Sequence, residues 1–319
     1  MTENKGTAVD YAALDIAEGI SAEPLTQWSL FWRRFQNHRL AMVSAITLLL
    51  IASTVIFADL LPLKDPLATL KDSTGRIANL LSPRSEWWFG TDELGRDVLS
   101  RVIYGGRTSL IVASLTGLIV ATLGTLVGSF SGYYGGWVDT ITMRFVDLVL
   151  GLPLLPVAIV AAAWLREAFE GKEAVALALL LGLLSWGGLA RIVRAEFLSL
   201  REKEFVEAAR AAGARDRRII VRHILPNALS PIIVNTTLVI GSAIIIEAAL
   251  SFLGFGVRPP TPAWGQMAST GGTLAVGGAD AWWLLVFPAG ALIITVLAVN
   301  FLGDGLRDAL DPTQTMERR

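Results

Sequence analysis

Long, nearly uncharged segments recur along this chain, and they limit its possible folds more than any other feature. They lie at about residues 40–61, 109–130, 143–165, 174–190, 228–250 and 282–302. A helix of about 20 apolar residues can cross the hydrocarbon core of a bilayer. The composition agrees, since 53% of the residues are apolar, only 17% are charged, and the mean hydropathy is +0.55. We predict an all-α integral membrane protein with six transmembrane helices.

The rest of the composition narrows the classes of function. A net charge of −1 gives no general attraction to nucleic acid. The chain has no cysteine, and its two histidines, His38 and His223, lie far apart and cannot alone form a metal site. Gly171-Lys172 is no phosphate-binding loop, because Glu173 follows in place of Ser or Thr and the earlier glycine is missing. We expect no catalytic residues, no metal site and no cofactor bound by this chain, and no enzyme activity of its own.

The amino-terminal part combines a polar tail with an aromatic segment. Residues 1 to about 27 are polar and unpatterned, and we expect no cleaved signal peptide. Trp28, Phe31, Trp32 and Phe35 then recur at helical spacing, with arginines beside them. We predict an interfacial helix whose aromatic rings lie among the lipid headgroups.

The segment before the second span carries a dense polar run. Between residues 90 and 110 the sequence reads GTDELGRDVLSRVIYGGRTSL. In a helix Leu94, Val98 and Val102 would share one face. We therefore predict a short helix that lies on the membrane before the second span begins.

A stripe of glycines marks the second span. Gly124, Gly128 and Gly132 recur at four-residue intervals, and small residues at this interval let membrane helices approach closely. The stripe fits packing within the subunit, and it also fits a dimer interface.

The third span begins with charges and contains prolines. Asp139, Arg144 and Asp147 lie at its entry, where structural pairing and a substrate role are the alternatives. Pro153 and Pro156 should kink the helix.

The fifth span carries polar side chains at membrane depth. Asn235, Thr236 and Thr237 could line a polar pathway for a substrate. Hydrogen bonds between helices are the alternative use of such residues. After this span a rigid turn region rich in proline is expected, with a short helix from Trp264 to Thr270.

A polar island separates the fourth and fifth spans. In it Ala208, Ala209 and Ala212 would place small side chains on one side of a short helix, so that another protein could pack closely there. Gly213 could adopt a positive φ and turn the chain. Asp216 could cap a second short helix over 217–224, which Pro226 would limit.

The distribution of charge predicts the topology. The loop between the fourth and fifth spans holds about nine Arg and Lys against about five acidic residues, and arginines also precede the first span. Loops rich in Arg and Lys stay in the cytoplasm. Six spans then place both termini and the polar island in the cytoplasm.

The island resembles the E-A-A-x-x-x-G loop of the permease subunits of ABC importers. The resemblance rests on Glu207-Ala208-Ala209 with Gly213, and on Leu225-Pro226 at the family's I-x-L-P ending. His223 stands at the isoleucine position of that ending, a form similar to the dipeptide and oligopeptide branch. The run between residues 90 and 110 is similar to the signature before the second span in that branch. The resemblance extends from about Trp28 to Pro312.

This resemblance implies a fold and a set of partners. The fold is that of type I importer permeases, a core of five spans, with one extra amino-terminal span. The implied partners are a second homologous permease subunit, two ABC ATPase subunits that bind ATP and Mg, and an extracytoplasmic substrate-binding protein. The location is the bacterial inner membrane. Glu207, Ala208 and Ala209 would form the ATPase contact, Gly213 would permit its turn, and Leu225-Pro226 would anchor it to the fifth span.

The implied boundaries divide the chain into four parts. Residues 1–39 form a cytoplasmic tail and interfacial helix, and 40–108 the first span with an extracytoplasmic loop. Residues 109–310 form the permease domain with its coupling loop 191–227, and 311–319 a carboxy-terminal tail. The implied function is half of an ATP-coupled pathway for dipeptides or oligopeptides, or alternatively for nickel, glutathione or another small solute.

Two other classes compete with an importer permease. A secondary transporter or channel would need paired charges at mid-membrane and inverted repeats, and the charges here cluster at the ends of the spans. A membrane scaffold without transport activity would have no need for a docking island of this spacing.

Overall fold

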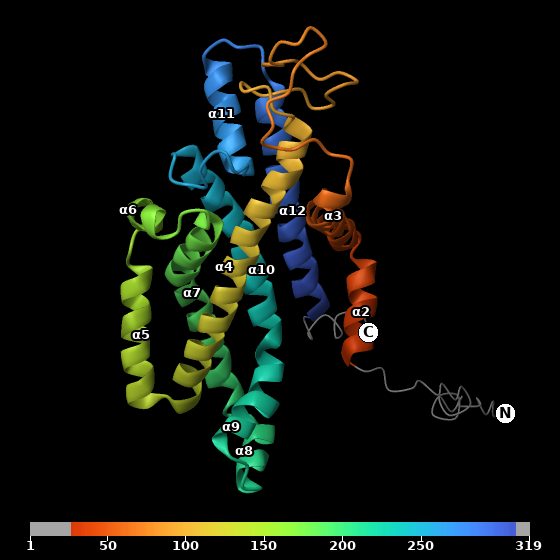
Figure 1. Ribbon diagram of the computed structural model, residues 1–319. Helices are drawn as coiled ribbons and strands as arrows, with labels where there is room; N and C mark the ends of the chain where they lie inside the picture. Colours follow the sequence, from red (N-terminus) through yellow and green to blue (C-terminus); the bar gives the residue numbers. More distant parts are fainter. Residues whose placement is uncertain (1–26, 311–319) are drawn as a thin grey trace, which may run out of the picture.

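The computed structural model describes residues 27–310, so the predicted tail over 1–26 and the end of the chain over 311–319 lie outside the described residues. Helices make up most of the described part, which contains no strand beyond isolated bridges. The longer helices form one bundle, and most of them run along its length (Figure 1). They are α3 (Arg39–Ile56), α4 (Val98–Tyr134), α5 (Gly136–Leu150), α6 (Leu154–Ala168), α7 (Glu173–Leu200), α10 (Leu225–Phe252) and α12 (Trp283–Leu310).

Shorter elements connect or flank these helices. They are α2 (Gln27–Asn37), the 3₁₀ turn Ala58–Leu60, α8 (Glu204–Ala211), α9 (Asp216–Arg218), the π-helix Ile219–Ile224 and α11 (Trp264–Val276). Within residues 27–310, five helices are long and apolar enough to cross a membrane, and the bent pair α5–α6 brings the number to six if it is one span. The bundle is therefore consistent with six passes.

The second span is longer than its apolar core. The predicted surface helix before it is wrong, because α4 runs unbroken from Val98 to Tyr134 and Leu94 lies in a turn outside it. Asp97 caps the helix, its Oδ2 accepting the N–H of Ser100 at 2.8 Å. Periodicity could not show this, since a helix on the surface and the first turns of a span have the same spacing.

The glycine stripe of α4 packs against α7, within the subunit. A methyl group on Gly124 would meet Leu189 at 2.8 Å, and one on Gly128 would meet Val193 at 2.7 Å. These distances are shorter than carbon atoms allow, so only glycine permits this approach of the two helices. Of the two predicted uses of the stripe, packing within the subunit is the one observed.

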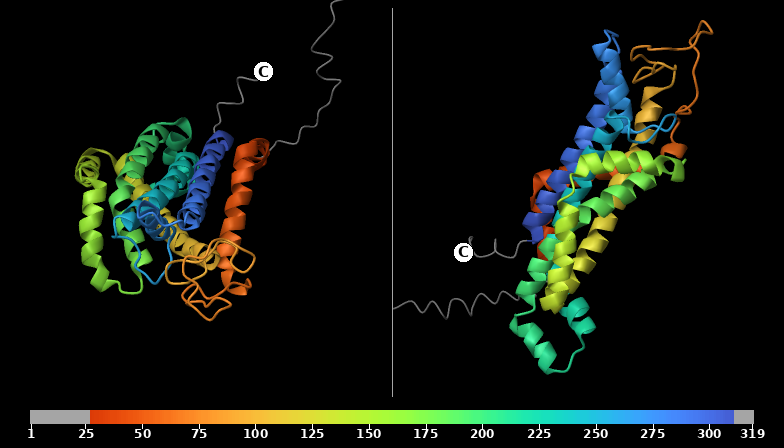
Figure 2. Two further views of the ribbon diagram at one scale, coloured as in Figure 1. Left: turned by 90° about the horizontal axis from the view of Figure 1, so that it is seen from above. Right: turned by 90° about the vertical axis from the view of Figure 1, so that its left-hand side faces the viewer.

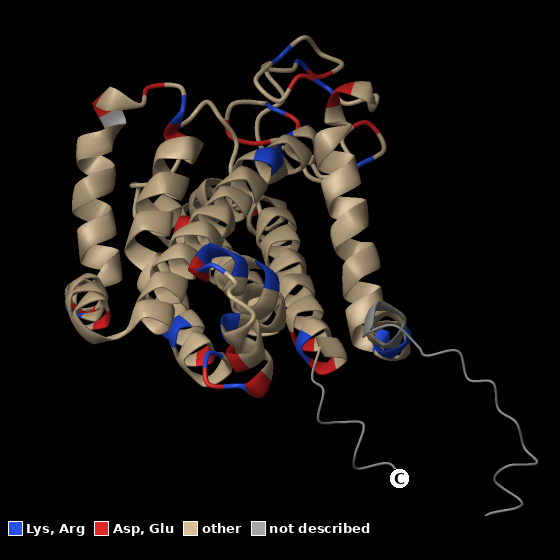
Figure 3. Ribbon diagram, turned by 90° about the horizontal axis from the view of Figure 1, so that it is seen from below, with Lys and Arg blue, Asp and Glu red and all other residues tan. Residues whose placement is uncertain are grey.

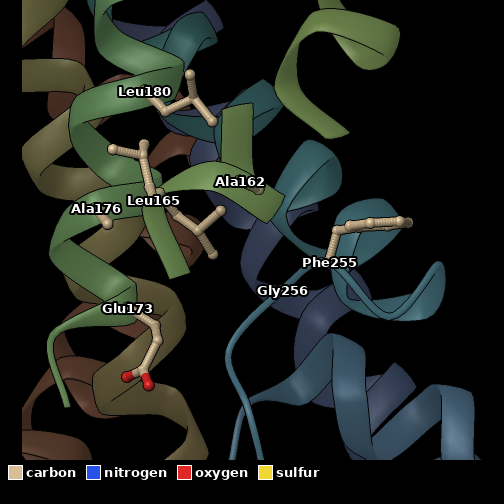
Figure 4. Close-up of a pocket in the computed structure, with 8 residues that line it drawn as sticks. Ala162, Leu165, Glu173, Ala176, Leu180, Phe255 and Gly256 are labelled. Carbon is tan, nitrogen blue, oxygen red and sulfur yellow. The ribbon is translucent and has the colours of Figure 1, made fainter. Parts of the chain in front are cut away.

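The third span is broken where a kink was predicted. The helix ends at Leu150 and restarts at Leu154, after Pro153, and α5 and α6 enclose an angle of 81°. Proline has no N–H to donate and its ring clashes with the preceding turn, which favours a new helix start. Figure 4 shows Ala162 and Leu165 of α6 directed towards α7 and towards the turn with Phe255, in an apolar recess that has the Glu173 carboxylate at one end.

Of the three predicted charges of the third span, the two aspartates pair with α7. Asp139 accepts from the Nε and Nη2 of Arg194, and it also accepts from Ser131 at 2.6 Å. Asp147 accepts from Arg191 at 2.5 Å. Structural pairing is thus observed, but between helices rather than along one helix.

The amino-terminal helices lie against the end of α12. Phe35 is only 6% exposed and packs with Ala309 and Leu306, while Trp32 is 55% exposed. The aromatic segment forms the predicted helix, yet one side of it contacts protein.

At the other end of α3, the hydrogen bond from Arg107 and a second one from Tyr104 hold the pKa of Asp59 below its ordinary value.

The long loop before α4 is built from two similar turns. Both have the sequence Asp-x-x-Gly-Arg, at 72–76 and 92–96. In each, the Asp Oδ1 accepts the N–H groups two and four residues later, at 2.8 to 3.0 Å, and the glycine has a positive φ, 80° and 74°. The Leu70 N–H donates to Gly95 O at 2.9 Å, which links the two turns.

The second turn fastens this loop to the bundle. Its Asp92 is 4% exposed and accepts from Arg96 at 2.7 Å, with the Arg101 Nε at 3.5 Å. Thr91 accepts from Trp283 Nε1 of α12 at 3.1 Å. The dense polar run is therefore a buried structural joint at one end of the helices.

The two ends of the molecule differ in kind. The loop before α4 and helix α11 lie at one end, and α8 and α9 lie at the other (Figures 1 and 2). Seen from the α8 end, the charged residues gather at helix ends and connections while the shafts of the helices are nearly free of charge (Figure 3). This is the distribution that a bilayer around the shafts requires.

Candidate functional site

The polar island forms a compact projection beyond the ends of α7 and α10 (Figures 1 and 2). We call residues 201–224 the projection. It consists of α8, a turn at Gly213, α9 and the π-helix Ile219–Ile224. Because it extends past the apolar shafts, its outer surface is available to a partner protein.

Helix α8 has an inner and an outer side. Val206 is fully buried and Ala209 is half-buried, and both pack into the main apolar cluster of the bundle. Glu207, Ala208 and Ala211 are exposed, as is Ala212 just after the helix. The outer side of the projection carries small side chains, as predicted. However, Ala209 is half-buried against the bundle, and Ala211 is exposed on the outer side instead.

Gly213 makes the predicted turn. Its φ is +77°, and its N–H donates to Arg210 O at 3.0 Å. A side chain at Gly213 would meet nothing within 4 Å. The need for glycine at this position is therefore conformational, and crowding plays no part.

The second half of the projection differs from the prediction. No separate helix ends before Pro226, because the helical segment runs on from Asp216 to Phe252. The chain widens into a π-helix just before the proline, with the Leu225 N–H donating to Ile220 O. Such widening accommodates a proline that can neither donate nor approach the preceding turn closely. Leu225 and Pro226 thus lie inside one continuous rod.

The projection is firmly attached to the bundle. Tyr133 of α4 donates to Asp216 Oδ1 at 2.7 Å. Arg201 donates to the carbonyl oxygens of Gly132 and Tyr133 at 3.2 and 3.3 Å. Ile219 and Ile224 are completely buried in the same apolar cluster as Val206. A force applied to the projection would therefore reach α4, α7 and α10 together.

Sequence reasoning missed the contribution of Tyr133 and Arg201. Tyr133 lies in the run Tyr-Tyr-Gly-Gly, whose glycines are typical of a turn and indicate no distant partner. Its partner Asp216 follows 83 residues later. No periodicity joins positions so far apart, so only the tertiary structure reveals the contact.

The predicted pathway residues lie at one level of α10. Asn235 donates to Pro231 O at 2.8 Å and Thr237 to Ile233 O at 2.9 Å, both within their own helix. The Thr236 hydroxyl is buried without a hydrogen-bond partner among residues 27–310. The predicted alternative, hydrogen bonds between helices, is not what Asn235 and Thr237 form.

These features are those of a helical membrane protein with a projection at one end of its bundle. The family described as binding-protein-dependent transport system inner membrane component matches residues 124–315. The N-terminal transmembrane domain of oligopeptide transport permease C matches residues 26–83. The chain belongs to the family of binding-protein-dependent transport system inner membrane components, and it is a permease subunit of an ABC importer.

Several curated relatives resemble nearly the whole chain. The dipeptide transport system permease protein DppC of Bacillus subtilis is 38% identical over 296 residues, 93% of this chain and 89% of that protein. The glutathione transport system permease protein GsiD of Escherichia coli O1:K1 is 41% identical over 290 residues, 90% of this chain and 91% of that protein.

A solved structure shares the fold. It is an inward-facing conformation of the MetNI methionine ABC transporter, with a TM-score of 0.53 and 19% identity. The match covers 66% of this chain and 96% of that one. The core of the bundle therefore has the type I importer fold, as predicted.

Proposed function

We propose that this chain imports peptides by coupling its helical bundle to ATPase subunits through the projection. The observation that carries the proposal is the outer side of α8, where Ala208 and Ala211 leave room for another protein's surface beside Glu207. The inner side is fixed in the bundle. A helix with small side chains on its outer side and close packing on its inner side suits the transfer of movement from one subunit to another.

The partners follow from this role. Two ABC ATPase subunits would bind ATP and Mg and hold the projection, and a second homologous permease would complete the pathway. An extracytoplasmic binding protein would deliver the substrate. Peptides are proposed because relatives named for dipeptide and peptide transport cover most of the chain. The relative named for glutathione transport fits the same class loosely, since glutathione is itself a small peptide.

The orientation is part of the proposal. The projection and both termini would face the cytoplasm, because residues 191–227, which contain the projection, hold about nine Arg and Lys against about five acidic residues. The loop before α4 and helix α11 would then face the outer compartment. Asn235 and Thr237 would line the pathway from α10, together with Thr236, whose hydroxyl lacks a partner among the described residues.

The mechanism is alternating access. ATP must bind more tightly to the complex in its outward-facing state than in its inward-facing state, since equal affinities shift no equilibrium. Closure of the ATPase subunits would move the projection, and the rod from Asp216 to Phe252 would carry that movement across the membrane. Hydrolysis would return the complex to the inward-facing state.

A bulky residue on the outer side of α8 tests the coupling role. Ala208→Trp should reduce ATP-driven peptide uptake into vesicles by about tenfold or more, since overpacking a close contact costs about 1–3 kcal/mol. Ala168→Trp is the matched control, because Ala168 is also exposed but lies at the end of α6. Uptake by an assembled Ala208→Trp complex equal to that of the control would refute the proposal.

A further inference from the structure

A carboxyl group is completely buried near the end of α10. Glu247 has 0% of its surface exposed, although it lies in a helix long and apolar enough to span a membrane. It packs at the level where α10 crosses α4. Ionisable groups at such depth are costly to bury and therefore need a function.

The partners of Glu247 are two hydroxyl groups. Ser251, one turn later in α10, donates to its Oε1 at 2.8 Å, and Ser109 of α4 donates to its Oε2 at 3.2 Å. No Lys, Arg or His among residues 27–310 forms an ion pair with it. Among the described residues this carboxyl group is therefore held by hydrogen bonds and has no counter-charge.

Glu247 stands beside a corner of the chain, residues 251–264, where α10 turns towards α11. Thr108 of α4 donates to Pro262 O at 2.9 Å, and Trp264 Nε1 donates to Val102 O at 2.7 Å. Gly256 lies directly against Ser251, with no room for a side chain. These two hydrogen bonds attach the corner to α4. Glu247 adds a further connection, because it bonds to Ser109 of α4 and to Ser251 at the start of the corner.

This corner is the far end of the rod that begins in the projection. The helical segment from Asp216 to Phe252 is continuous, and Tyr133 holds its first residue while Ser109 faces Glu247 near its last turn. Both Tyr133 and Ser109 belong to α4. Any movement of the rod relative to α4 must therefore be taken up between these two contacts.

We propose that Glu247 is a positioning residue that clamps the outer corner to α4, so that movement of α10 reaches the outer face of the pathway. The inference rests on the proposed coupling function, and it adds the outer contact through which that coupling acts. The clamp consists of the hydrogen bonds to Ser109 and Ser251, and because a serine hydroxyl can accept as well as donate, the amide of a glutamine could bond to both. It follows that Gln should replace Glu247, whereas Leu, of similar volume but without polar atoms, should not.

The first measurement is ATP-driven peptide uptake by complexes of equal assembly. Glu247→Gln should keep at least about half of the wild-type rate, and Glu247→Leu should lose about thirtyfold, as for two lost hydrogen bonds of about 1 kcal/mol each. Thr122→Val is the matched control on α4, since its hydroxyl bonds only Leu118 O of its own helix. A Leu variant that transports as well as the Gln variant would overturn the clamp.

The second measurement follows the corner itself. The chain has no cysteine, so Arg258→Cys, at an exposed corner position, takes a spin label at one site only. The label should be equally immobile with Glu247 and with Glu247→Gln, and clearly more mobile with Glu247→Leu. Equal mobility in all three would overturn the clamp. Absence of ATP-driven uptake in the wild type would instead refute the coupling function, while the label would still decide the clamp.

Discussion

At the scale of single residues, the projection depends on a few side chains with distinct duties. Gly213 supplies a backbone conformation that other residues rarely adopt. Ala208 and Ala211 supply an outer side without bulk, and Val206 anchors the inner side. Tyr133 contributes from a distant part of the chain. Because each residue has a separate structural role, each role can be tested by its own substitution.

Gly213→Ala should impair uptake through the backbone alone. A left-handed conformation costs a residue with a side chain about 1–2 kcal/mol, and no neighbour would touch the new methyl group. Gly171→Ala is a matched control, since Gly171 has a φ of +74° and equally free surroundings in the turn before α7. Peptide uptake per assembled complex should fall for Gly213→Ala only. Equal effects of the two substitutions would mean that the conformation of the projection does not matter.

Tyr133→Phe should weaken the attachment of the projection. The change removes one hydrogen bond to Asp216, with a loss of about 1 kcal/mol. We expect more ATP hydrolysed per peptide imported, because the projection can then move without the bundle. The neighbouring Tyr134→Phe serves as the control, since Tyr134 is about half exposed. An unchanged ratio of ATP to peptide in Tyr133→Phe would contradict this role.

At the scale of elements, helix α4 holds the bundle together. It packs closely against α7 through its glycine stripe, faces Glu247 of α10, and contacts the projection at its end. The bend between α5 and α6 is a second feature at this scale, because it turns α6 across the bundle. The prolines predicted a bend, but the angle of the bend depends on what α6 packs against.

Gly128→Val should separate α4 from α7. A branched side chain would collide with Val193 and with the backbone at Ala190, and overpacking of this kind typically costs about 1–3 kcal/mol. Thermal unfolding in detergent should show a lower Tm. In contrast, Gly188→Ala on α7 should leave the Tm unchanged or raise it slightly, since nothing lies within 4 Å of that position and alanine favours helix. A Gly128→Val protein as stable as the wild type would show that the stripe is not tightly packed.

At the scale of the whole molecule, alternating helices place the projection at one end and the loop before α4 at the other (Figure 1). This arrangement agrees with six passes if the bent α5–α6 pair is one of them. The described ends of the chain meet near α12, where His38 lies 3.5 Å from Asp308. The orientation in the membrane can be tested with reagents that cannot cross it.

Single cysteines should report two sides of the membrane. In a chain without native cysteine, Ser73→Cys and Glu170→Cys should react with an impermeant maleimide added to intact spheroplasts. Arg215→Cys, exposed in the projection, should react only after lysis. Labelling of position 170 from the inside would show that α5 and α6 form a re-entrant loop, and labelling of position 215 from the outside would reverse the proposed topology.

Much of this organisation was predictable from local patterns. The apolar segments, the turn at Gly213 and the helix after Trp264 each depend on residues close in sequence. The predictions that failed concern boundaries, such as the separate helix before the second span and the end expected before Pro226. Whether a helix continues past such a position depends on what packs around it, and spacing alone does not contain that information.

By itself, the sequence determined the membrane class and the approximate spans, because burial of apolar surface and backbone hydrogen bonding in lipid leave few alternatives. The tertiary structure alone decided that Ala209 turns inward, that the charges of α5 pair with α7, and that Tyr133 and Glu247 join α4 to α10. These contacts link residues far apart along the chain. Their geometry arises only when the helices pack, since each side chain then competes with all its neighbours for the same space.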